Sequence, residues 1–493
     1  MKLVRRARTT RFARDHEFER IRGVADYQKR VPLRAYEDFW TQYWRSDFPC
    51  LTNVTWPGTI PYLALSSGTT GGPTKHIPVS TQMLRSNRRA ALTALAFYGA
   101  ANPESRLFEG RLFFLGGSTD LTRLTPRHSI PPFCRAPRQI LAGDLSAIAS
   151  REVGRAFHPY TFPPAELALI RDWDEKIQLL AERSASLPIT AICGIPSWLL
   201  VLFGRLKQLT GRRSIAEIWP TLRLVIHGGT KFDPYQDLFR QEIGSDRVQF
   251  LETYPCSEGF VAAEDPAYER LRLIPDHGIF FEFVPVEDLG KDHPVRHTTA
   301  NLETGVQYAV VLTTCAGLWS YVLGDTVCFQ AREPPLLRFT GRTRYFLSAF
   351  GEHLISEEVE KAITKASEAT GAAVTDFHVG PQFPTSTAVA GRHLYLIEFA
   401  RMPVGIPTFA KELDAALCRL NDDYRGHRQG DLSLAGPEIR LVPPGGFARW
   451  LRSKGRLGGQ HKVPRMDNSG ELTQELCHWL GESSPAPERG CLL

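Results

Sequence analysis

A loop rich in hydroxyl side chains and glycines follows a short apolar run early in the chain. Residues 66–72 read SSGTTGG, with four hydroxyls and three glycines in seven residues, and a lysine follows at position 75. Glycines let backbone N–H groups approach an anion closely, and Ser and Thr hydroxyls add short donors beside them. No Gly-Lys-Ser/Thr triplet closes the loop, so it is not a Walker A motif. We predict a nucleotide phosphate-binding loop rather than a flexible turn, with candidate residues Ser66, Ser67, Gly68, Thr69 and Thr70.

The longer run at positions 66–80, SSGTTGGPTKHIPVS, resembles the phosphate-binding motif of the ANL superfamily of adenylate-forming enzymes. It is more similar still to the GH3 branch, the acyl acid amido synthetases known from plant hormone conjugation and also found in bacteria. Three further motifs follow in that family's order: TYPCSEG at 253–259, YVLGD at 321–325 and GQHKVPR at 459–465. The resemblance extends over about residues 20–470.

The resemblance implies a site for ATP and Mg²⁺. Tyr254 is expected to stack on the adenine, and Glu258, in one motif with Ser257, is expected to hold Mg²⁺ against the phosphates. Asp325 is expected to receive the ribose hydroxyls. These residue types suit the roles, because an aromatic face fits a base and a carboxylate fits a hard cation or a vicinal diol. Each motif alone would also fit an ordinary strand end or turn.

The segment FTGRTRYFLSAFGE at 339–352 resembles the superfamily hinge, about which the C-terminal domain rotates. Gly341 and Gly351 would permit such a swing, and Arg342 is expected to contact the nucleotide ribose or phosphates. Tyr345 and Ser348 stand where acyl-CoA ligases carry the hinge Asp and Lys. This departure favours the GH3 pattern over that of a CoA ligase.

A lysine in the last motif completes the catalytic candidates. Lys462 is expected to reach the α-phosphate and to stabilise the charge that develops during attack by a carboxylate. The alternative is that Lys462 is a solvated basic residue without a catalytic role. Lys454 lies nearby in the sequence and could fill the role instead. Arg342 and Lys462 are therefore the predicted catalytic residues.

Strand-like apolar runs alternate with helical patterns from about residue 60, which predicts an α/β fold. We expect a large N-terminal α/β domain (1–341) with β-sheets flanked by helices. A smaller, mobile α+β domain of ANL type (342–482) and a disordered tail (483–493) follow. Residues 15–45 look helical, and Pro334 and Pro335 break any element near the boundary. Expected strands include 189–193, 222–226, 248–251, 278–284, 307–313, 374–379, 393–399 and 437–442, and expected helices include 81–98, 197–209, 356–370 and 408–420.

Composition excludes several other classes of protein. The nine cysteines form no C-x-x-C pair and are odd in number, which argues against a zinc site or a disulfide framework and favours a reducing compartment. The basic N-terminus lacks the apolar run of a secretory signal, and no long apolar stretch predicts a membrane span. The net charge of +6 is scattered rather than gathered in a nucleic-acid-binding module. We expect a cytoplasmic enzyme with neither nucleic-acid nor membrane partners.

The motifs together predict two half-reactions. A carboxylic acid is adenylated by Mg-ATP with release of pyrophosphate, and the acyl group then passes to an amine, expected to be that of an amino acid. The alternatives are transfer to CoA or to a carrier protein, or a homologue that binds nucleotide without turnover. The acyl pocket is expected near residues 193–198 and 227–229, although ordinary sheet–helix packing explains these residues equally well.

Overall fold

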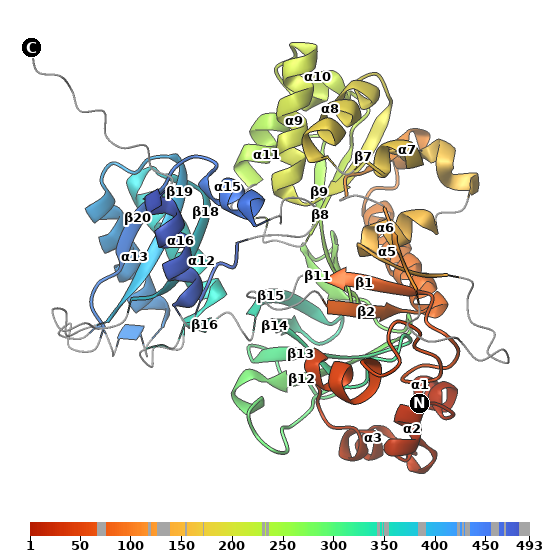
Figure 1. Ribbon diagram of the computed structural model, residues 1–493. Helices are drawn as coiled ribbons and strands as arrows, with labels where there is room; N and C mark the ends of the chain where they lie inside the picture. Colours follow the sequence, from red (N-terminus) through yellow and green to blue (C-terminus); the bar gives the residue numbers. More distant parts are fainter. Residues whose placement is uncertain are drawn as a thin grey trace, which may run out of the picture.

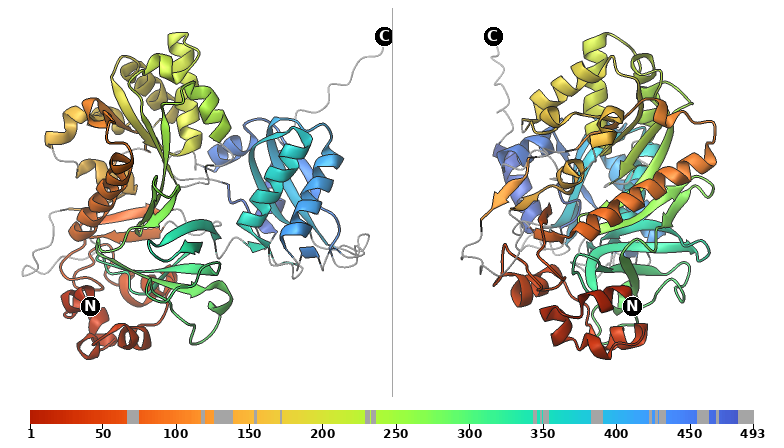
Figure 2. Two further views of the ribbon diagram at one scale, coloured as in Figure 1. Left: turned by 180° about the vertical axis from the view of Figure 1, so that it is seen from behind. Right: turned by 90° about the vertical axis from the view of Figure 1, so that its right-hand side faces the viewer.

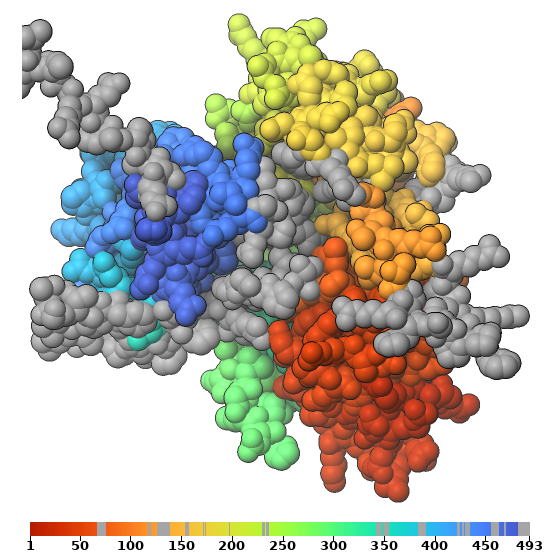
Figure 3. Space-filling view, in the orientation of Figure 1, coloured from red at the N-terminus to blue at the C-terminus, as the bar shows by residue number. Residues whose placement is uncertain are grey.

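The structure is a computed structural model in which two units lie side by side (Figure 1). It describes residues 1–66, 75–116, 120–125, 139–152, 155–170, 172–228, 232, 236–342, 346–347, 349, 354–382, 391–421, 424–425, 428, 434–454, 463–467 and 470–482. We call residues 1–342 the large unit and residues 346–482 the small unit. Figure 3 shows the small unit, in blue, beside the yellow and green part of the large unit.

An 11-stranded mixed sheet forms the framework of the large unit, in the order β12-β13-β14-β15-β11-β10-β9-β8-β7-β3-β6. The strands from β9 to β6 run parallel, whereas those from β12 to β9 are antiparallel. Their bounds are β3 Arg111–Phe114, β6 Thr161–Phe162, β7 Ile189–Gly194, β8 Leu224–Gly228, β9 Gln249–Cys256, β10 Gly259–Asp265, β11 Arg270–Leu273, β12 Ile279–Pro285, β13 Gln307–Thr314, β14 Tyr321–Ala331 and β15 Leu336–Arg342.

Helices cover both faces of the parallel half of this sheet (Figure 2). On one face, the 21-residue helix α5 (Thr81–Ala101) presents Ala90, Ala94 and Tyr98 at helical spacing. They pack with apolar side chains of β7, β8 and β9. The opposite face carries α8 (Trp173–Ser184), α9 (Pro196–Thr210), α10 (Ile215–Ile218) and α11 (Gln236–Ile243). The shorter helices α6 (Leu145–Arg151) and α7 (Ala165–Ala168) lie near the edge of the sheet.

A second sheet of four strands, in the order β2-β1-β5-β4, joins the large unit. Strands β1 (Tyr62–Ser66) and β2 (Lys75–Val79) are antiparallel, with Ser66 opposite Lys75. Ser66 and Lys75 flank the rest of the hydroxyl- and glycine-rich motif, residues 67–74, which lie outside the described part. Strands β5 (Ile140–Gly143) and β4 (Thr122–Leu124) complete the sheet.

The N-terminal segment packs against the antiparallel half of the large sheet. It is broken into α1 (Lys2–Ala7), α2 (Arg11–Asp15), α3 (Val24–Arg30) and α4 (Tyr36–Phe39), followed by a π-helical turn, Trp40–Trp44. The prediction of helix over 15–45 is thus correct only in pieces. Helix α3 begins after Gly23 and ends at Arg30, because the residue before Pro32 is driven to an extended conformation.

The small unit is built on a three-stranded sheet: β18 (Ala373–Gln382), β19 (Arg392–Arg401) and β20 (Glu438–Val442). Helices α12 (Ser356–Thr370) and α13 (Ile406–Leu420) cover one face, and α15 (Gly446–Ser453) and α16 (Glu471–Glu482) cover the other. The short strands β16 (Phe346–Leu347) and β17 (Leu354–Ile355) precede α12. The predicted strands and helices of this region are confirmed. No described helix has the length and apolar character that crossing a bilayer requires.

Candidate active site

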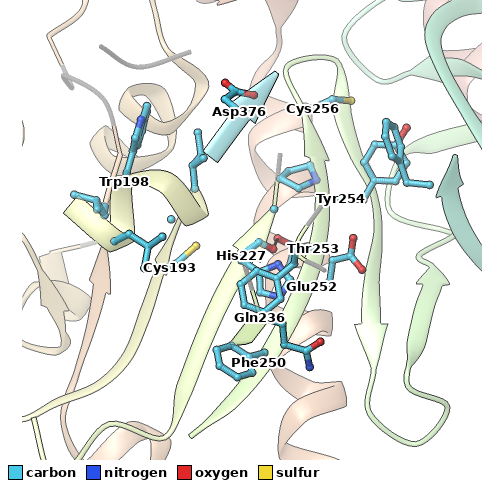
Figure 4. Close-up of a pocket in the computed structure, with 18 of the residues that line it drawn as sticks. Cys193, Trp198, His227, Gln236, Phe250, Glu252, Thr253, Tyr254, Cys256 and Asp376 are labelled. Atoms are coloured by element: carbon cyan, nitrogen blue, oxygen red, sulfur yellow. Dashed lines mark hydrogen bonds between the residues drawn. The ribbon is translucent and has the colours of Figure 1, made fainter. Parts of the chain in front are cut away.

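A cavity of about 3290 Å³ opens at the carboxyl ends of the parallel strands and extends between the two units. Open α/β sheets bind ligands at this edge because several strands end there side by side. The cavity is lined by the described candidates Ser66, Tyr254, Ser257, Glu258 and Asp325. Figure 4 shows Tyr254 and Cys256 on one side of this space, and Trp198 and Cys193 on the other. The sequence candidates that the structure describes are therefore brought together.

Asp325 and Tyr254 form a buried hydrogen-bonded pair. The Tyr254 hydroxyl donates to Asp325 Oδ2 at 2.7 Å, and only 8% of Tyr254 and 3% of Asp325 are exposed. The Tyr254 ring also meets Phe339 edge-on, with centroids 5.5 Å apart. The strand expected at 248–251 extends further, so Tyr254 lies inside β9. Both side chains are thus held by the sheet itself.

Glu258 is the second buried carboxylate of the site. Burial raises the pKa of Glu258, while the hydrogen bond from Tyr321, the positive charge of Lys75 and the backbone N–H of Glu258 act in the opposite direction. The Tyr321 hydroxyl donates to Glu258 Oε1 at 3.0 Å. Burial and the Glu258 charge raise the pKa of Tyr321 well above its ordinary value, so this phenol stays protonated at neutral pH. A carboxylate buried among these partners is suited to a cationic ligand.

Lys75 links the hairpin loop to this carboxylate. Its Nζ lies 5.3 Å from the centroid of the Tyr36 ring, and the backbone N–H of His76 donates to the Tyr36 hydroxyl at 2.9 Å. The N-terminal helices therefore fix the start of β2, and with it one end of the loop that carries the phosphate-binding candidates. Ser66, at the other end, lines the cavity, while Ser67, Gly68, Thr69 and Thr70 lie outside the described residues.

The two predicted catalytic cations are defined only in part. Arg342 is the last residue of β15 and is paired in register with Asp325, which places its backbone at the site. Its side chain and the whole of Lys462 lie outside the description. The rival Lys454 lines the cavity but forms an ion pair with Glu475, with Lys454 Nζ 2.6 Å from Glu475 Oε1.

Residues 463–467, directly after Lys462, run along the free edge of β18. The Val379 N–H donates to the Arg465 carbonyl at 2.8 Å, and the Asp467 N–H donates to the Val379 carbonyl at 2.9 Å. Arg465 forms an ion pair with Glu360 at 2.8 Å. The chain directly after Lys462, the predicted catalytic residue, is therefore fixed to β18. Arg465 and Asp376 both line the cavity, and sequence analysis assigned neither of them a role.

Cys193 and His227, one from each stretch expected near the acyl pocket, lie on opposite faces of the sheet. In the parallel pair β7–β8, Cys193 is opposite Ile226 and Gly194 is opposite His227. Paired side chains share a face and successive ones alternate, so Cys193 faces the α5 side and His227 the α9 side. Both side chains nevertheless line the cavity, so the expectation that the acyl pocket lies near these stretches stays a prediction.

His227 is a neutral, buried imidazole. It stacks on Phe232 with ring centroids 3.8 Å apart, and burial lowers its pKa to about 3. Burial likewise raises the pKa of the Cys193 thiol to about 12, so this thiol is not a ready nucleophile. Neither group supplies charge at neutral pH, and both serve as parts of the cavity wall.

Comparison with known proteins agrees with this geometry. Models of the GH3 family N-terminal, central and C-terminal domains match residues 1–248, 272–342 and 357–471 in order. A jasmonoyl–L-amino acid synthetase of Oryza sativa subsp. japonica is 25% identical over 514 residues, covering 90% of this chain and 86% of that protein. An indole-3-acetic acid-amido synthetase of Oryza sativa subsp. indica is 29% identical over 221 residues, but that match spans only 35% of its length and 41% of this chain.

The fold is shared with solved adenylate-forming enzymes. The GH3.15 acyl acid amido synthetase superposes with a TM-score of 0.76 at 18% identity, covering 98% of this chain and 92% of that one. A 2-hydroxyisobutyryl-CoA ligase in a postadenylation state superposes with a TM-score of 0.62 at 12% identity and the same coverage. The resemblance inferred from the motifs is confirmed, since one family model alone spans residues 1–248 of 493 and two more continue to residue 471: the chain belongs to the GH3 family.

Proposed function

We propose that this protein is an ATP-dependent acyl acid amido synthetase. It adenylates a carboxylic acid, releases pyrophosphate and transfers the acyl group to the amine of an amino acid. The observation that carries the proposal is the pair of buried carboxylates, Glu258 and Asp325, which line the same cavity as Ser66 at the start of the hydroxyl- and glycine-rich motif. Relatives named as amido synthetases support the same reaction class.

Each nucleotide-binding group has a proposed part. Asp325 accepts the ribose hydroxyls, Tyr254 stacks on the base, and the loop from Ser66 to Thr70 donates to the phosphates. Arg342 and Lys462 offset negative charge at the ribose and the α-phosphate. Asp325 and Tyr254 already lie in contact, which supports recognition of a nucleoside by neighbouring groups.

Glu258 fits the role of a single protein ligand to Mg²⁺. Among the described residues, no group of three or more His, Cys, Asp or Glu side chains could enclose a metal ion. One carboxylate next to a phosphate-binding loop matches the way Mg²⁺ is held by one or two carboxylates plus substrate phosphates. When bound, the ion would neutralise phosphate charge during the first half-reaction.

The proposed chemistry needs positioning more than covalent catalysis. A carboxylate oxygen of the acid attacks the α-phosphorus, the bond to pyrophosphate breaks, and an acyl-AMP mixed anhydride results. The neutral amine then attacks the acyl carbon, AMP leaves, and the amine proton passes to solvent. In-line placement supplies much of the rate enhancement, because the protein forms no bond to the substrate.

The acid is proposed to have an apolar body. Helix α5 and the segments near it contribute many apolar side chains to the cavity lining, together with the polar Asn87 and the charged Arg88 and Glu152; the apolar ones are Leu84, Ala91, Leu92, Leu95, Leu112, Phe114, Leu145 and Phe157. Such a wall favours aryl or branched acids over small polar ones. The relatives named for indole-3-acetic acid and jasmonoyl conjugation act on acids of this kind.

We also propose that the small unit is a domain that moves against the large one about residue 342. Strand β15 ends there, as does the match to the family's central domain. Arg338 of β15 pairs with Glu357 of α12 across this boundary, so the arrangement described has a definite contact to break. The tail at 483–493 and the cytoplasmic location stay predictions from the sequence.

Acid-dependent pyrophosphate release from Mg-ATP tests the function. Aryl, indolyl and short fatty acids are offered singly, with hydroxylamine as a trapping amine, and productive acids are then tested with amino acids and with CoA. Release together with hydroxamate, followed by amide formation with an amino acid, is the expected result. Thioester formation with CoA and no amide product would contradict the proposed acceptor. Nucleotide binding without pyrophosphate release for any acid would contradict the proposed reaction.

A further inference from the structure

Two tyrosines and two carboxylates connect β14 to β9 and the turn after it in a reciprocal arrangement. Tyr254 of β9 donates to Asp325 of β14 at 2.7 Å, whereas Tyr321 of β14 donates to Glu258, just after β9, at 3.0 Å. β9 and β14 are not neighbours in the sheet, because β15, β11 and β10 lie between them. The two hydrogen bonds therefore fix the separation of the carboxylates by side-chain contact as well as through the sheet.

Tyr321 differs from Tyr254 in its access to the cavity. Tyr254, Glu258 and Asp325 all line the cavity, but Tyr321 does not, and it is only 1% exposed. A residue in that position has no direct contact with a nucleotide. Any effect it has on the reaction must pass through the carboxylate that its hydroxyl contacts.

The N-terminal segment holds Tyr321 in place. The Arg34 N–H donates to the Ser320 carbonyl at 3.0 Å, and the Val322 N–H donates to the Arg34 carbonyl at 2.9 Å, so Arg34 brackets Tyr321. The ring of Phe39 lies 6.2 Å from the Tyr321 ring. With its backbone and ring both constrained, the phenol has little freedom to follow a carboxylate that moves.

We propose that Tyr321 is a positioning residue that orients the Glu258 carboxylate toward a nucleotide-bound divalent cation. The inference rests on the proposed function of the site. The phenol occupies Oε1 of Glu258 and so restrains the carboxylate, while Glu258 still lines the cavity from which an ion would approach. In the same way, Tyr254 orients Asp325 toward the ribose. Its contribution to nucleotide affinity is therefore independent of the cation.

Calorimetric titration of a non-hydrolysable ATP analogue, at several Mg²⁺ concentrations and without Mg²⁺, tests this assignment. Tyr321→Phe should raise the Mg²⁺ concentration needed for half-maximal enhancement of binding by about tenfold, the scale of one hydrogen bond to a charged group, with metal-free affinity unchanged. Tyr254→Phe should weaken binding by about tenfold to the same extent with and without Mg²⁺. Tyr424→Phe, which removes a comparable hydroxyl–carboxylate bond to Asp414 (2.7 Å) in the small unit, should change neither quantity.

A double-mutant cycle distinguishes an effect of Tyr321 through Glu258 from a general structural effect of the substitution. In a Glu258→Gln background, which keeps the shape of the side chain but removes its charge, Tyr321→Phe should cause no further change in Mg²⁺ dependence. Equal Mg²⁺ dependence in the wild type and Tyr321→Phe would overturn the positioning role alone. A wild-type protein that binds no Mg-ATP analogue would overturn this role together with the proposed function.

Discussion

The acidic and basic groups around the cavity are held in different ways. Glu258 and Asp325 are buried in the large unit, and each accepts a hydrogen bond from a neutral phenol. Lys454 and Arg465 of the small unit are 44% and 23% exposed in their side chains, and each is tied by an ion pair to a glutamate. A phenol carries no charge to oppose that of a carboxylate, so this arrangement suits the binding of a cation and a sugar proposed for the large unit.

The small unit contributes cations whose effect depends on where the unit lies. Exposed ion pairs are weak and are screened by salt, so Lys454 can exchange partners at little cost, whereas the Arg465–Glu360 pair is more buried. The comparison suggests a division of labour: binding of the nucleotide belongs to the large unit, and charge compensation during the reaction belongs to the small one. Substitutions in each unit test that division.

The largest expected effect is that of Lys462→Ala, which should change the rate of adenylation rather than the affinity for ATP. Lys462→Ala should slow acid-dependent pyrophosphate release by roughly 100- to 1,000-fold, the range for removing one electrostatic stabiliser of a transition state. The dissociation constant for ATP should change by no more than about threefold, because the ground-state contacts lie in the large unit. Rapid-quench measurement of pyrophosphate, with calorimetry of ATP binding, checks both. An unchanged rate would remove Lys462 from the mechanism.

The stability of the small unit should depend on pH through His378, which connects β18 to Pro464 and Thr473. This residue is fully buried, its Nδ1 contacts the Pro464 carbonyl at 2.5 Å, and its Nε2 contacts Thr473 Oγ1 at 2.9 Å. Burial lowers its pKa to about 4. A histidine whose pKa is lowered by folding stabilises the native state above its unfolded pKa of about 6.5, and this stabilisation is lost as pH falls toward 4.

The expected loss is about 3 kcal/mol between pH 7 and pH 4, from a pKa difference of roughly 2.5 units. Denaturant unfolding followed at both pH values measures it. His378→Gln keeps an amide donor toward Pro464 but does not titrate, so its unfolding free energy should fall by about 3 kcal/mol less over the same range. Parallel pH profiles for the two proteins would show that His378 does not titrate on unfolding.

A smaller effect is expected at the ribose end of the large unit. Asp325→Ala removes a buried acceptor and leaves the Tyr254 hydroxyl without its partner, so ATP and AMP affinity should both fall by about 10- to 100-fold. Asp325→Asn keeps one oxygen acceptor and should lie between that variant and the wild type. Calorimetry with AMP isolates this contact from the metal and the outer phosphates. Equal AMP affinity in all three proteins would exclude the ribose contact.

Much of the fold followed from periodicity in the sequence. The strands and helices of the small unit were predicted closely because their apolar patterns are clear and glycines such as Gly371 mark helix ends. The N-terminal segment was read as more continuous than it is. Its short helices are stabilised by packing under the antiparallel sheet, as at Phe12 and Phe39, and that contact is invisible in a local pattern.

The motifs indicated the individual site residues, but they did not predict the hydrogen bonds between those residues. Tyr321 and Asp325 are four residues apart on one strand, so they share a face, and that spacing was an available signal. The Tyr321–Glu258 bond spans 63 residues, and no local pattern encodes such a pairing. The stretches expected near the acyl pocket line the cavity, but the placement of Cys193 and His227 on opposite faces of the sheet follows only from the β7–β8 register.

The smallest predicted effect decides between the two lysines of the small unit. Lys454 forms a half-exposed ion pair with Glu475, a geometry that contributes only about 0–1 kcal/mol to stability. Lys454→Ala should therefore slow pyrophosphate release by less than about threefold, and raised salt should reduce even that difference. Glu475→Gln, which frees Lys454 without removing it, serves as the matched control and should be equally mild. A 100-fold loss in Lys454→Ala, with Lys462→Ala nearly unaffected, would transfer the α-phosphate role from the loop before residue 463 to the end of α15.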